Sequence, residues 1–325
     1  MRSAHEFWTP RRIPTGPPVD VSGQVVGLEW AWLRQSATDG PASDTLRLHG
    51  SARGSVLLLH GLTGAPSELA YVAHYLHRRA QLDVWCPPLL NHGQPIGVLA
   101  RTRWRELHAS VKNQFDDARR IASQNGEPLI VGGLSMGAVL SLMLAAQFPA
   151  DVAGVICLAP TLFYDGWNVP WTQRLIPLVD FTPLKYFTYQ REEPPYGLRD
   201  EALRARIARE YDNIRLEDEG GPNRGYAHYP IRLMCEMHRL IRACKDSLPQ
   251  VTCPILIVQA ENDDATSPRN ANFIHQRVGS RRKELLLLRE SFHMITADLE
   301  RAKVAGAMEK FCRSLIQDSD RSGQY

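Results

Sequence analysis

The stretch LIVGGLSMGAVLSLMLAAQ, residues 129–147, decides the fold of this 325-residue chain. It begins with an apolar run, Leu129 to Leu134, which has the length of a buried strand. It ends with small and aliphatic residues, Met136 to Gln147, which have the length of a helix. A buried strand that leads straight into a helix predicts one unit of a mainly parallel sheet with helices on both faces.

The alternation of strand and helix continues on both sides of this stretch. Continuous apolar runs predict the strands, and apolar residues at helical spacing predict the helices. We expect further strands at 24–30, 45–49, 55–60, 82–86, 152–159, 254–260 and 284–288, and helices at 67–79, 104–121 and 296–316. The sequence therefore predicts an α/β fold.

The alternation stops at Pro160 and resumes at Pro254, which predicts an insertion between two strands of one sheet. We call residues 161–240 the inserted segment and expect it to be a mainly helical lid. The core is then formed by residues 21–160 and 241–325. Residues 1–20 contain four prolines, which prevent a regular helix or central strand, and are expected to form an extended arm.

Composition excludes several classes of protein. With 44% hydrophobic and 22% charged residues the chain resembles an ordinary globular protein, and its net charge of +3 predicts no nucleic-acid partner. No apolar stretch has the length of a secretory signal or a membrane span, so no stable membrane insertion is expected. The six cysteines lack zinc-type spacing, which indicates buried thiols and a cytoplasmic protein.

The sequence Gly133-Leu134-Ser135-Met136-Gly137 is a G-x-S-x-G motif between the predicted strand and helix. A serine on so tight a turn leaves no room for a Cβ atom two residues before or after it, which explains both glycines. The motif predicts an exposed nucleophilic serine. The alternative is a glycine-rich turn that binds phosphate at the start of a helix.

A serine nucleophile needs a histidine base and a carboxylate that orients it. Two later predicted strands end at suitable residues: one leads into Glu261-Asn262-Asp263-Asp264 and the last leads into His293. The carboxyl ends of neighbouring parallel strands converge on one crevice. The alternative for His293 is a capping or core histidine before the last helix.

Two backbone amides must also face the oxyanion that forms during acyl transfer. Met136 follows the serine directly and is expected to supply one amide. Leu62, in the glycine-containing turn His60-Gly61-Leu62-Thr63-Gly64, is expected to supply the other. We expect His60 to hydrogen-bond within this turn, and Arg101, Arg103 and Arg105 to be solvated charges at the start of a helix.

Four motifs, HGLTG (60–64), GLSMG (133–137), QAENDDATSP (259–268) and SFHMIT (291–296), together resemble the α/β-hydrolase superfamily. Within it they resemble the bacterial carboxylesterases and monoacylglycerol lipases. The resemblance covers residues 54–160 and 250–316. It implies an α/β-hydrolase fold and a serine esterase that forms an acyl-enzyme, acts on a small-molecule ester and needs no cofactor or metal.

The resemblance also implies roles for particular residues. Ser135 would be the nucleophile, Asp263 and His293 its partners, and Leu62 and Met136 the oxyanion donors. Asp264 is expected to face away from His293, and Phe292 stands where relatives commonly have glycine. The aromatic residues Trp167, Trp171, Phe181 and Phe187 are expected either to line an apolar substrate pocket or to form the core of the lid.

The same constellation of serine, histidine and aspartate is compatible with other acyl chemistry. A thioesterase, a peptidase and an acyltransferase are the alternatives with turnover. A binding protein that keeps the hydrolase fold without catalysis is the alternative from another class. The sequence predicts neither the acyl group, the alcohol nor the oligomeric state.

Overall fold

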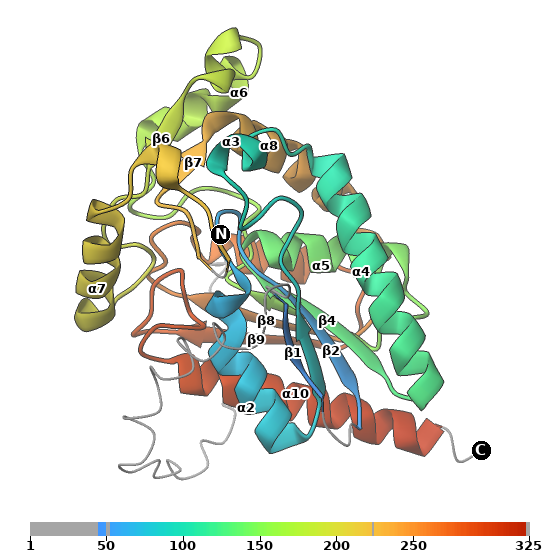
Figure 1. The fold of residues 1–325 in the computed structure, drawn as a ribbon. Helices are drawn as coiled ribbons and strands as arrows, with labels where there is room; N and C mark the ends of the chain where they lie inside the picture. The colour runs from blue at the N-terminus through green and yellow to red at the C-terminus, as the bar shows by residue number, and fades with distance from the viewer. Residues whose placement is uncertain (1–44, 50–52, 223, 323–325) are drawn as a thin grey trace, which may run out of the picture. The chain divides into compact units, whose positions relative to one another are not determined.

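The computed structural model describes residues 45–49, 53–222 and 224–322. The predicted arm at 1–20 and the predicted strand at 24–30 lie outside these residues. Within them, seven strands form one sheet in the order β1-β3-β2-β4-β5-β8-β9 (Figure 1). These strands are β1 (Leu46–Leu48), β2 (Ser55–Leu59), β3 (Asp83–Cys86), β4 (Leu129–Leu134), β5 (Gly154–Leu158), β8 (Ile255–Ala260) and β9 (Lys283–Leu288).

All neighbouring strands are parallel except β1, which pairs with β3 in the antiparallel direction. β4 lies between β2 and β5, and β8 lies on the far side of β5. The loops that follow β4, β8 and β9 therefore leave the same edge of the sheet. This arrangement confirms the predicted α/β fold.

Helices cover both faces of the sheet (Figure 1). The helices and 3₁₀ turns of the core are η1 (Pro66–Leu69), α2 (Ala70–Ala80), α3 (Ile96–Leu99), α4 (Trp104–Asn125), α5 (Met136–Gln147), α8 (Ile231–Ser247), η5 (Leu248–Gln250), α9 (Arg269–Arg277) and α10 (Arg301–Ser322). Successive side chains of a strand point to opposite faces. Leu57 and Leu59 of β2 accordingly pack with α4, α5 and α8, whereas Val56 and Leu58 pack with α2 and α10.

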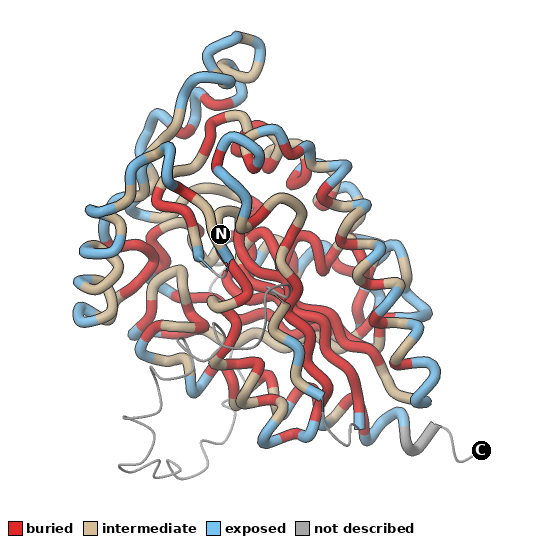
Figure 2. The backbone as a smooth tube through the Cα atoms, in the orientation of Figure 1, coloured by how far each residue is buried: buried red, intermediate tan, exposed pale blue. Residues whose placement is uncertain are grey.

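The core follows this two-sided burial, and Figure 2 shows the central strands as a buried layer. Helix α5 is buried almost all round, because it packs against β4 on one side and against α4 and α8 on the other. A helix in this position needs small and aliphatic residues, which is why its sequence lacks a polar stripe.

The inserted segment contains short elements: η2 (Trp171–Leu175), α6 (Ile176–Val179), η3 (Pro183–Tyr186), β6 (Tyr189–Arg191), α7 (Glu201–Asp212), η4 (Leu216–Asp218) and β7 (His228–Pro230). The strands β6 and β7 pair with one another and do not join the main sheet. Figure 1 shows α6, β6 and β7 near α3 and the start of α8. The second half of α8 packs in the core, so the predicted boundary at residue 240 falls inside one continuous helix.

The last helix begins later than the sequence predicts. We expected it from about residue 296, but α10 begins at Arg301. The side chain of Asp298 accepts hydrogen bonds from the amides of Arg199, Asp200 and Phe292, at 2.8 to 2.9 Å. These bonds hold residues before α10 in a loop that ties the inserted segment to the core.

Candidate active site

Ser135 lies on the sharp turn between β4 and α5. Its backbone has φ 56° and ψ −112°, a conformation that is costly for a residue with a side chain. The amide of Ser135 donates to the carbonyl oxygen of Leu158 at 2.8 Å, which ties the turn to β5. The strained turn raises the serine side chain above the end of the sheet.

The two glycines of the motif are required by close backbone packing. A Cβ atom on Gly137 would lie 1.9 Å from the carbonyl oxygen of Leu59, and one on Gly133 would lie 2.4 Å from the backbone of Gly137. No side chain fits at either position. The steric explanation given for the motif is therefore confirmed.

Three predicted residues form a continuous chain of hydrogen bonds. The Oγ atom of Ser135 lies 3.0 Å from Nε2 of His293, and Nδ1 of His293 lies 3.0 Å from both carboxylate oxygens of Asp263. A neutral imidazole donates from Nδ1 to the carboxylate and accepts the serine proton at Nε2. The arrangement can therefore activate Ser135 as a nucleophile.

Asp263 is held by several donors at the end of β8. The amides of Ala265 and Thr266 donate to its Oδ1 atom at 2.9 and 2.7 Å. Its Oδ2 atom accepts from the amide group of Gln259 at 2.8 Å and from the hydroxyl of Thr266 at 3.1 Å. These donors fix the carboxylate without neutralising it.

The environment of His293 favours its protonated form. Burial lowers the pKa of the imidazole, but the negative charges of Asp263, Asp264 and Glu68 outweigh that effect and raise the pKa to about 9. The site therefore stabilises the imidazolium that forms when the serine gives up its proton.

Asp264 does not face away from the site, so that expectation is wrong. Its carboxylate is buried, accepts the amide of His293 at 3.1 Å and accepts the amide of Gly197, in the inserted segment, at 3.2 Å. Burial raises the pKa of this carboxyl group. Asp264 therefore binds the backbone amide of His293, whereas Asp263 binds its ring. In a turning loop, two successive carboxylates can point toward the same residue.

The predicted oxyanion donors lie on two neighbouring loops. Met136 is the first residue of α5, where backbone amides have no partner within the helix. His92 donates from Nε2 to the carbonyl oxygen of Leu62 at 2.6 Å and so holds the other loop. As expected, His60 bonds within its turn, where Nδ1 donates to the carbonyl oxygen of Gly61 at 2.9 Å; its Nε2 also accepts the amide of Leu89, outside the turn, at 3.0 Å.

Two polar neighbours of the site were not predicted from the sequence. Thr161 is fully buried, and its hydroxyl lies 2.8 Å from Oγ of Ser135. Glu68 accepts the amide of Gly61 at 3.2 Å, and burial raises the pKa of its carboxyl group to about 7. Thr161 follows the end of β5. Its position at the carboxyl end of a central strand is the sequence signal that could have identified it.

The four aromatic residues predicted to contact substrate are exposed. Trp167 is 59% exposed, donates from its indole nitrogen to the carbonyl oxygen of Asn262, and contacts the ring of Phe292. It therefore lies beside the two loops that carry Asp263 and His293. The other three, Trp171, Phe181 and Phe187, lie farther along the inserted segment.

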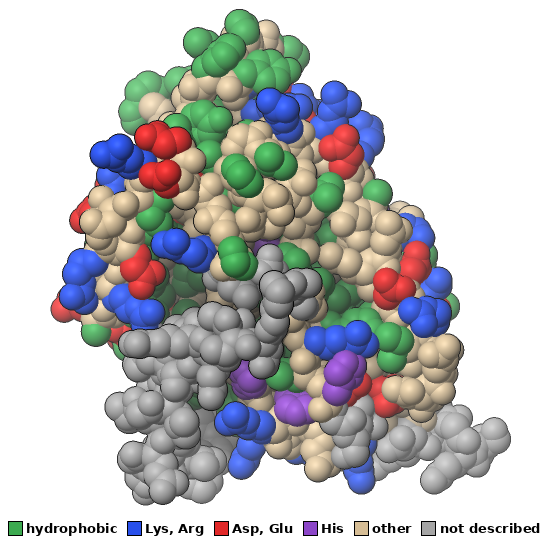
Figure 3. All heavy atoms as spheres, viewed as in Figure 1, with side chains coloured by type: hydrophobic (Ala, Val, Ile, Leu, Met, Phe, Trp, Pro, Cys, Tyr) green, Lys and Arg blue, Asp and Glu red, His purple; other side chains and the backbone are tan. Residues whose placement is uncertain are grey.

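We call residues 171–187 the tip. Its large apolar side chains are mostly exposed, and Figure 3 shows hydrophobic side chains gathered where the tip lies. Exposed members are Trp171, Leu175, Leu178, Phe181, Leu184, Tyr186 and Phe187. Ile176 is buried, in a small cluster with Ile231, Met234 and Cys235 of α8. The tip thus has one buried anchor and many exposed apolar groups.

The remaining sequence expectations concern cysteines, metals and membranes. The six cysteines are buried and free, as expected. Among the described residues, no group of His, Cys, Asp and Glu side chains is arranged to hold a metal ion. No helix in the described part of the chain is long and apolar enough to span a membrane.

Two features define an α/β-hydrolase: a mainly parallel sheet with helices on both faces, and a serine on a strained turn that is hydrogen-bonded to a histidine, which is hydrogen-bonded in turn to an aspartate. Residues 50–300 match the family model described as serine aminopeptidase, S33, and the chain belongs to this family.

The chain is similar to two curated bacterial proteins. It is 27% identical to a thermostable monoacylglycerol lipase from Bacillus sp. (strain H-257) over 251 residues, which cover 77% of this chain and 86% of that protein. It is 25% identical to a carboxylesterase from Bacillus subtilis (strain 168) over 261 residues, covering 80% and 93% respectively.

Solved structures show the same fold. A soluble variant of monoglyceride lipase from Saccharomyces cerevisiae superposes with a TM-score of 0.68 at 16% identity, covering 83% of this chain and 91% of that one. A structure from work on the metagenome-derived lipolytic enzymes LipS and LipT also has a TM-score of 0.68, at 24% identity, covering 84% and 98%.

Proposed function

We propose that this protein hydrolyses carboxylic esters through a covalent acyl-enzyme, with Ser135 as nucleophile, His293 as base and Asp263 as the orienting acid. One observation carries the proposal: two hydrogen bonds of 3.0 Å connect the serine to the histidine and the histidine to the aspartate. The three side chains come from loops after β4, β8 and β9, and the sheet holds these loops in place.

In the first half of the reaction Ser135 Oγ attacks the ester carbonyl carbon while Nε2 of His293 accepts the serine proton. The carbonyl oxygen becomes an oxyanion, which the amides of Leu62 and Met136 stabilise by hydrogen bonds. The bond to the alcohol then breaks, and His293 gives its proton to the departing alkoxide. The products are an alcohol and a serine-bound acyl group.

In the second half a water molecule replaces the alcohol. His293 accepts one water proton as the oxygen attacks the acyl carbon, and a second oxyanion forms in the same place. When the bond to Ser135 breaks, the proton returns from His293 to the serine oxygen. The carboxylic acid leaves and the enzyme regains its starting state without a cofactor.

Apolar surroundings support an apolar substrate. The side chain of Leu62 packs against core residues and also against a cluster within the inserted segment, formed by Ile176, Ile231, Met234 and Cys235. A hydrophobic group bound beside these residues would gain about 0.8 kcal/mol for each buried CH₂. A monoacylglycerol or a similar small ester fits this chemistry, and the similar proteins described above include a monoacylglycerol lipase and a carboxylesterase.

The inserted segment is proposed to act as a lid, with Trp167 and the aromatic residues of the tip as candidate substrate contacts. The six buried free thiols fit a protein that works in a reducing compartment, the cytoplasm. No binding of nucleic acid is proposed.

The experiment that tests this function combines labelling with a substrate series. An active-site fluorophosphonate should label the protein at Ser135. Rates should then be measured for p-nitrophenyl esters of increasing chain length, with thioester and amide analogues alongside. We expect ester cleavage to be fastest and to rise with chain length. Faster amide cleavage would instead support a peptidase, as the family description suggests, and absence of labelling would contradict a serine hydrolase.

A further inference from the structure

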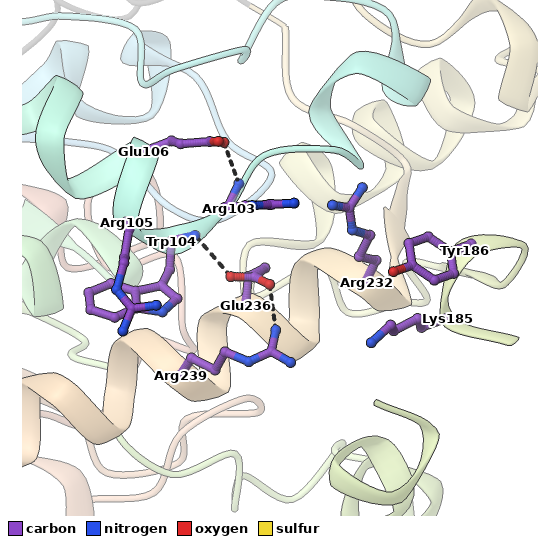
Figure 4. Close-up of a pocket in the computed structure, with 9 residues that line it drawn as sticks. All are labelled: Arg103, Trp104, Arg105, Glu106, Lys185, Tyr186, Arg232, Glu236 and Arg239. Atoms are coloured by element: carbon purple, nitrogen blue, oxygen red, sulfur yellow. Dashed lines mark hydrogen bonds and ion pairs between the residues drawn. The ribbon is translucent and has the colours of Figure 1, made fainter. Parts of the chain in front are cut away.

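One pocket has a lining that contains none of Ser135, Asp263 and His293. It has a volume of about 410 Å³ and is bordered by the start of α4, by η3 of the tip and by the outer face of α8. Its lining consists of five cationic side chains, two carboxylates and two aromatic rings: Arg103, Arg105, Lys185, Arg232, Arg239, Glu106, Glu236, Trp104 and Tyr186 (Figure 4). The lining is therefore strongly positive, although the whole chain carries only +3.

Each carboxylate of the pocket accepts a hydrogen bond from a neighbouring backbone amide. Glu106 accepts the backbone amide of Arg103 at 3.2 Å. Glu236 accepts the amide of Trp104 at 3.0 Å and pairs with Arg239. The five cations and two carboxylates leave the lining with a net charge of +3, and of the two carboxylates only Glu236 forms an ion pair with a lining cation.

The other cations divide into paired and unpaired groups. Lys185 pairs with Asp180 at 2.9 Å, and Arg239 also pairs with Asp180. Within the described part of the chain, no carboxylate pairs with Arg103, Arg105 or Arg232. Figure 4 shows the guanidinium groups of Arg103 and Arg232 pointing toward one another across the pocket.

Facing guanidinium groups repel one another unless an anion lies between them. Arginine presents planar pairs of N–H donors that match the oxygens of a phosphate group. Aromatic contacts position two of the arginines: Arg105 lies 4.8 Å from the ring centre of Trp104, and Arg232 lies 5.2 Å from that of Tyr186. The guanidinium groups of Arg105 and Arg232 therefore extend from two different helices, α4 and α8, and each is held by an aromatic ring.

We propose that this pocket binds the phosphate group of an anionic ligand, with Arg103 and Arg232 as the principal contacts and Arg105 as a further donor. The pocket volume lies in the range of small-molecule sites, about 300–1,000 Å³. The ligand would bridge the core and the inserted segment, because Arg103 precedes α4 while Lys185 and Tyr186 belong to η3.

This site is distinct from the one that contains Ser135. Arg232, Glu236 and Arg239 recur at the spacing of one helical face. Met234 and Cys235, on the buried side of α8, instead pack in the cluster that includes Leu62. The proposal does not depend on ester hydrolysis, since the pocket contains no residue of the serine, histidine and aspartate chain.

The test measures binding of two probes to the full chain. One probe is radiolabelled inorganic phosphate, used in equilibrium dialysis at low ionic strength. The other is a phosphatidylcholine vesicle with or without phosphatidic acid, used in sedimentation. We expect the combined substitution Arg103→Gln and Arg232→Gln to weaken binding of the effective probe at least tenfold. The matched control combines Arg281→Gln with Lys310→Gln, which removes two positive charges at exposed positions outside the lining of the pocket.

The two probes distinguish the source of the phosphate. Saturable binding of inorganic phosphate that needs Arg103 and Arg232 supports a free phosphorylated ligand. Binding only to vesicles with phosphatidic acid, with the same dependence, supports a lipid headgroup. Binding of neither probe, or equal losses in the double variant and in the control with Arg281→Gln and Lys310→Gln, overturns the proposal. Arg103→Lys with Arg232→Lys, which keeps the charge, should weaken binding less than the glutamine pair does.

Discussion

The site around Ser135 and the tip at 171–187 use side chains in opposite ways. Around Ser135 almost every polar group has a fixed partner, and the carboxylate of Asp263 alone accepts from Gln259, Ala265 and Thr266. At the tip, apolar groups such as Phe181 and Phe187 are 89% and 81% exposed. Substitutions in the first region should therefore change rates, whereas those in the second should leave the fold intact.

The largest expected effect is that of Ser135→Ala. Removal of the nucleophile abolishes the covalent route and should lower kcat by about a millionfold, judging from related triads. The matched control is Ser141→Ala in the same region, because Ser141 is buried and its hydroxyl donates to the carbonyl oxygen of Gly137. Kinetics with a p-nitrophenyl ester, together with thermal unfolding of both variants, make the comparison. Equal activity of the two variants would rule out the proposed nucleophile.

The two neighbouring aspartates give the next effect. Asp263→Asn should lower kcat by about ten thousandfold, because the carboxylate that orients and stabilises the imidazolium is lost. Asp264→Asn should cost about a hundredfold, because the amide of His293 loses its charged acceptor and the imidazole shifts. Steady-state kinetics of both variants test the ranking. A larger loss in Asp264→Asn would mean that Asp264 is the catalytic acid.

A pair of phenylalanines tests the contrast in stability directly. Phe115 of α4 is fully buried, so Phe115→Ala should lower the free energy of unfolding by about 3–5 kcal/mol. Phe181→Ala at the tip should change it by no more than about 0.5 kcal/mol. Urea unfolding followed by circular dichroism measures both. A large loss in Phe181→Ala would show that the tip is packed in solution.

Thr161 offers a smaller and more local test. Ser135 has one hydroxyl proton, so when it donates to His293 the hydroxyl of Thr161 is the donor to Ser135 Oγ. Thr161→Val removes this bond at nearly constant volume and should lower kcat about tenfold, the value of one hydrogen bond. Thr161→Ser keeps the hydroxyl and should restore most of the rate. Loss of activity in both variants would instead indicate a packing role.

The smallest expected effect is a shift in pH dependence. His293 acts as base only when neutral, and its pKa is about 9, so kcat/KM should rise with pH toward that value. The acidic groups whose charges act on the imidazole are Asp263, Asp264, Glu68 and Glu192. Glu68→Gln removes one of these charges, which destabilises the imidazolium and lowers the pKa of His293.

The acid limb of the pH profile should therefore move to lower pH in Glu68→Gln, by less than about one unit. Glu217→Gln, at an exposed position, is the matched control and should leave the profile unchanged. A shift to higher pH in Glu68→Gln would contradict the electrostatic explanation.

Much of the fold followed from local patterns. The predicted strand at 129–134 and the helix at 136–147 coincide with β4 and α5, because continuous apolar runs of these lengths have few other stable arrangements. The predicted family and the α/β fold are confirmed. The start of α10 was predicted too early, because Asp298 bonds to amides that are distant in sequence.

The sequence by itself determined where the proposed nucleophile stands, because the spacing of Gly133, Ser135 and Gly137 between an apolar run and a helix indicates a tight turn between strand and helix. Only the tertiary structure decided the inward direction of Asp264, the contact of Thr161 with Ser135, and the placement of Arg103 and Arg232 in the lining of one pocket. Each of these depends on contacts between distant segments. Periodicity and motif spacing indicate the conformation of a single segment. They do not specify which side chains of two distant segments come into contact.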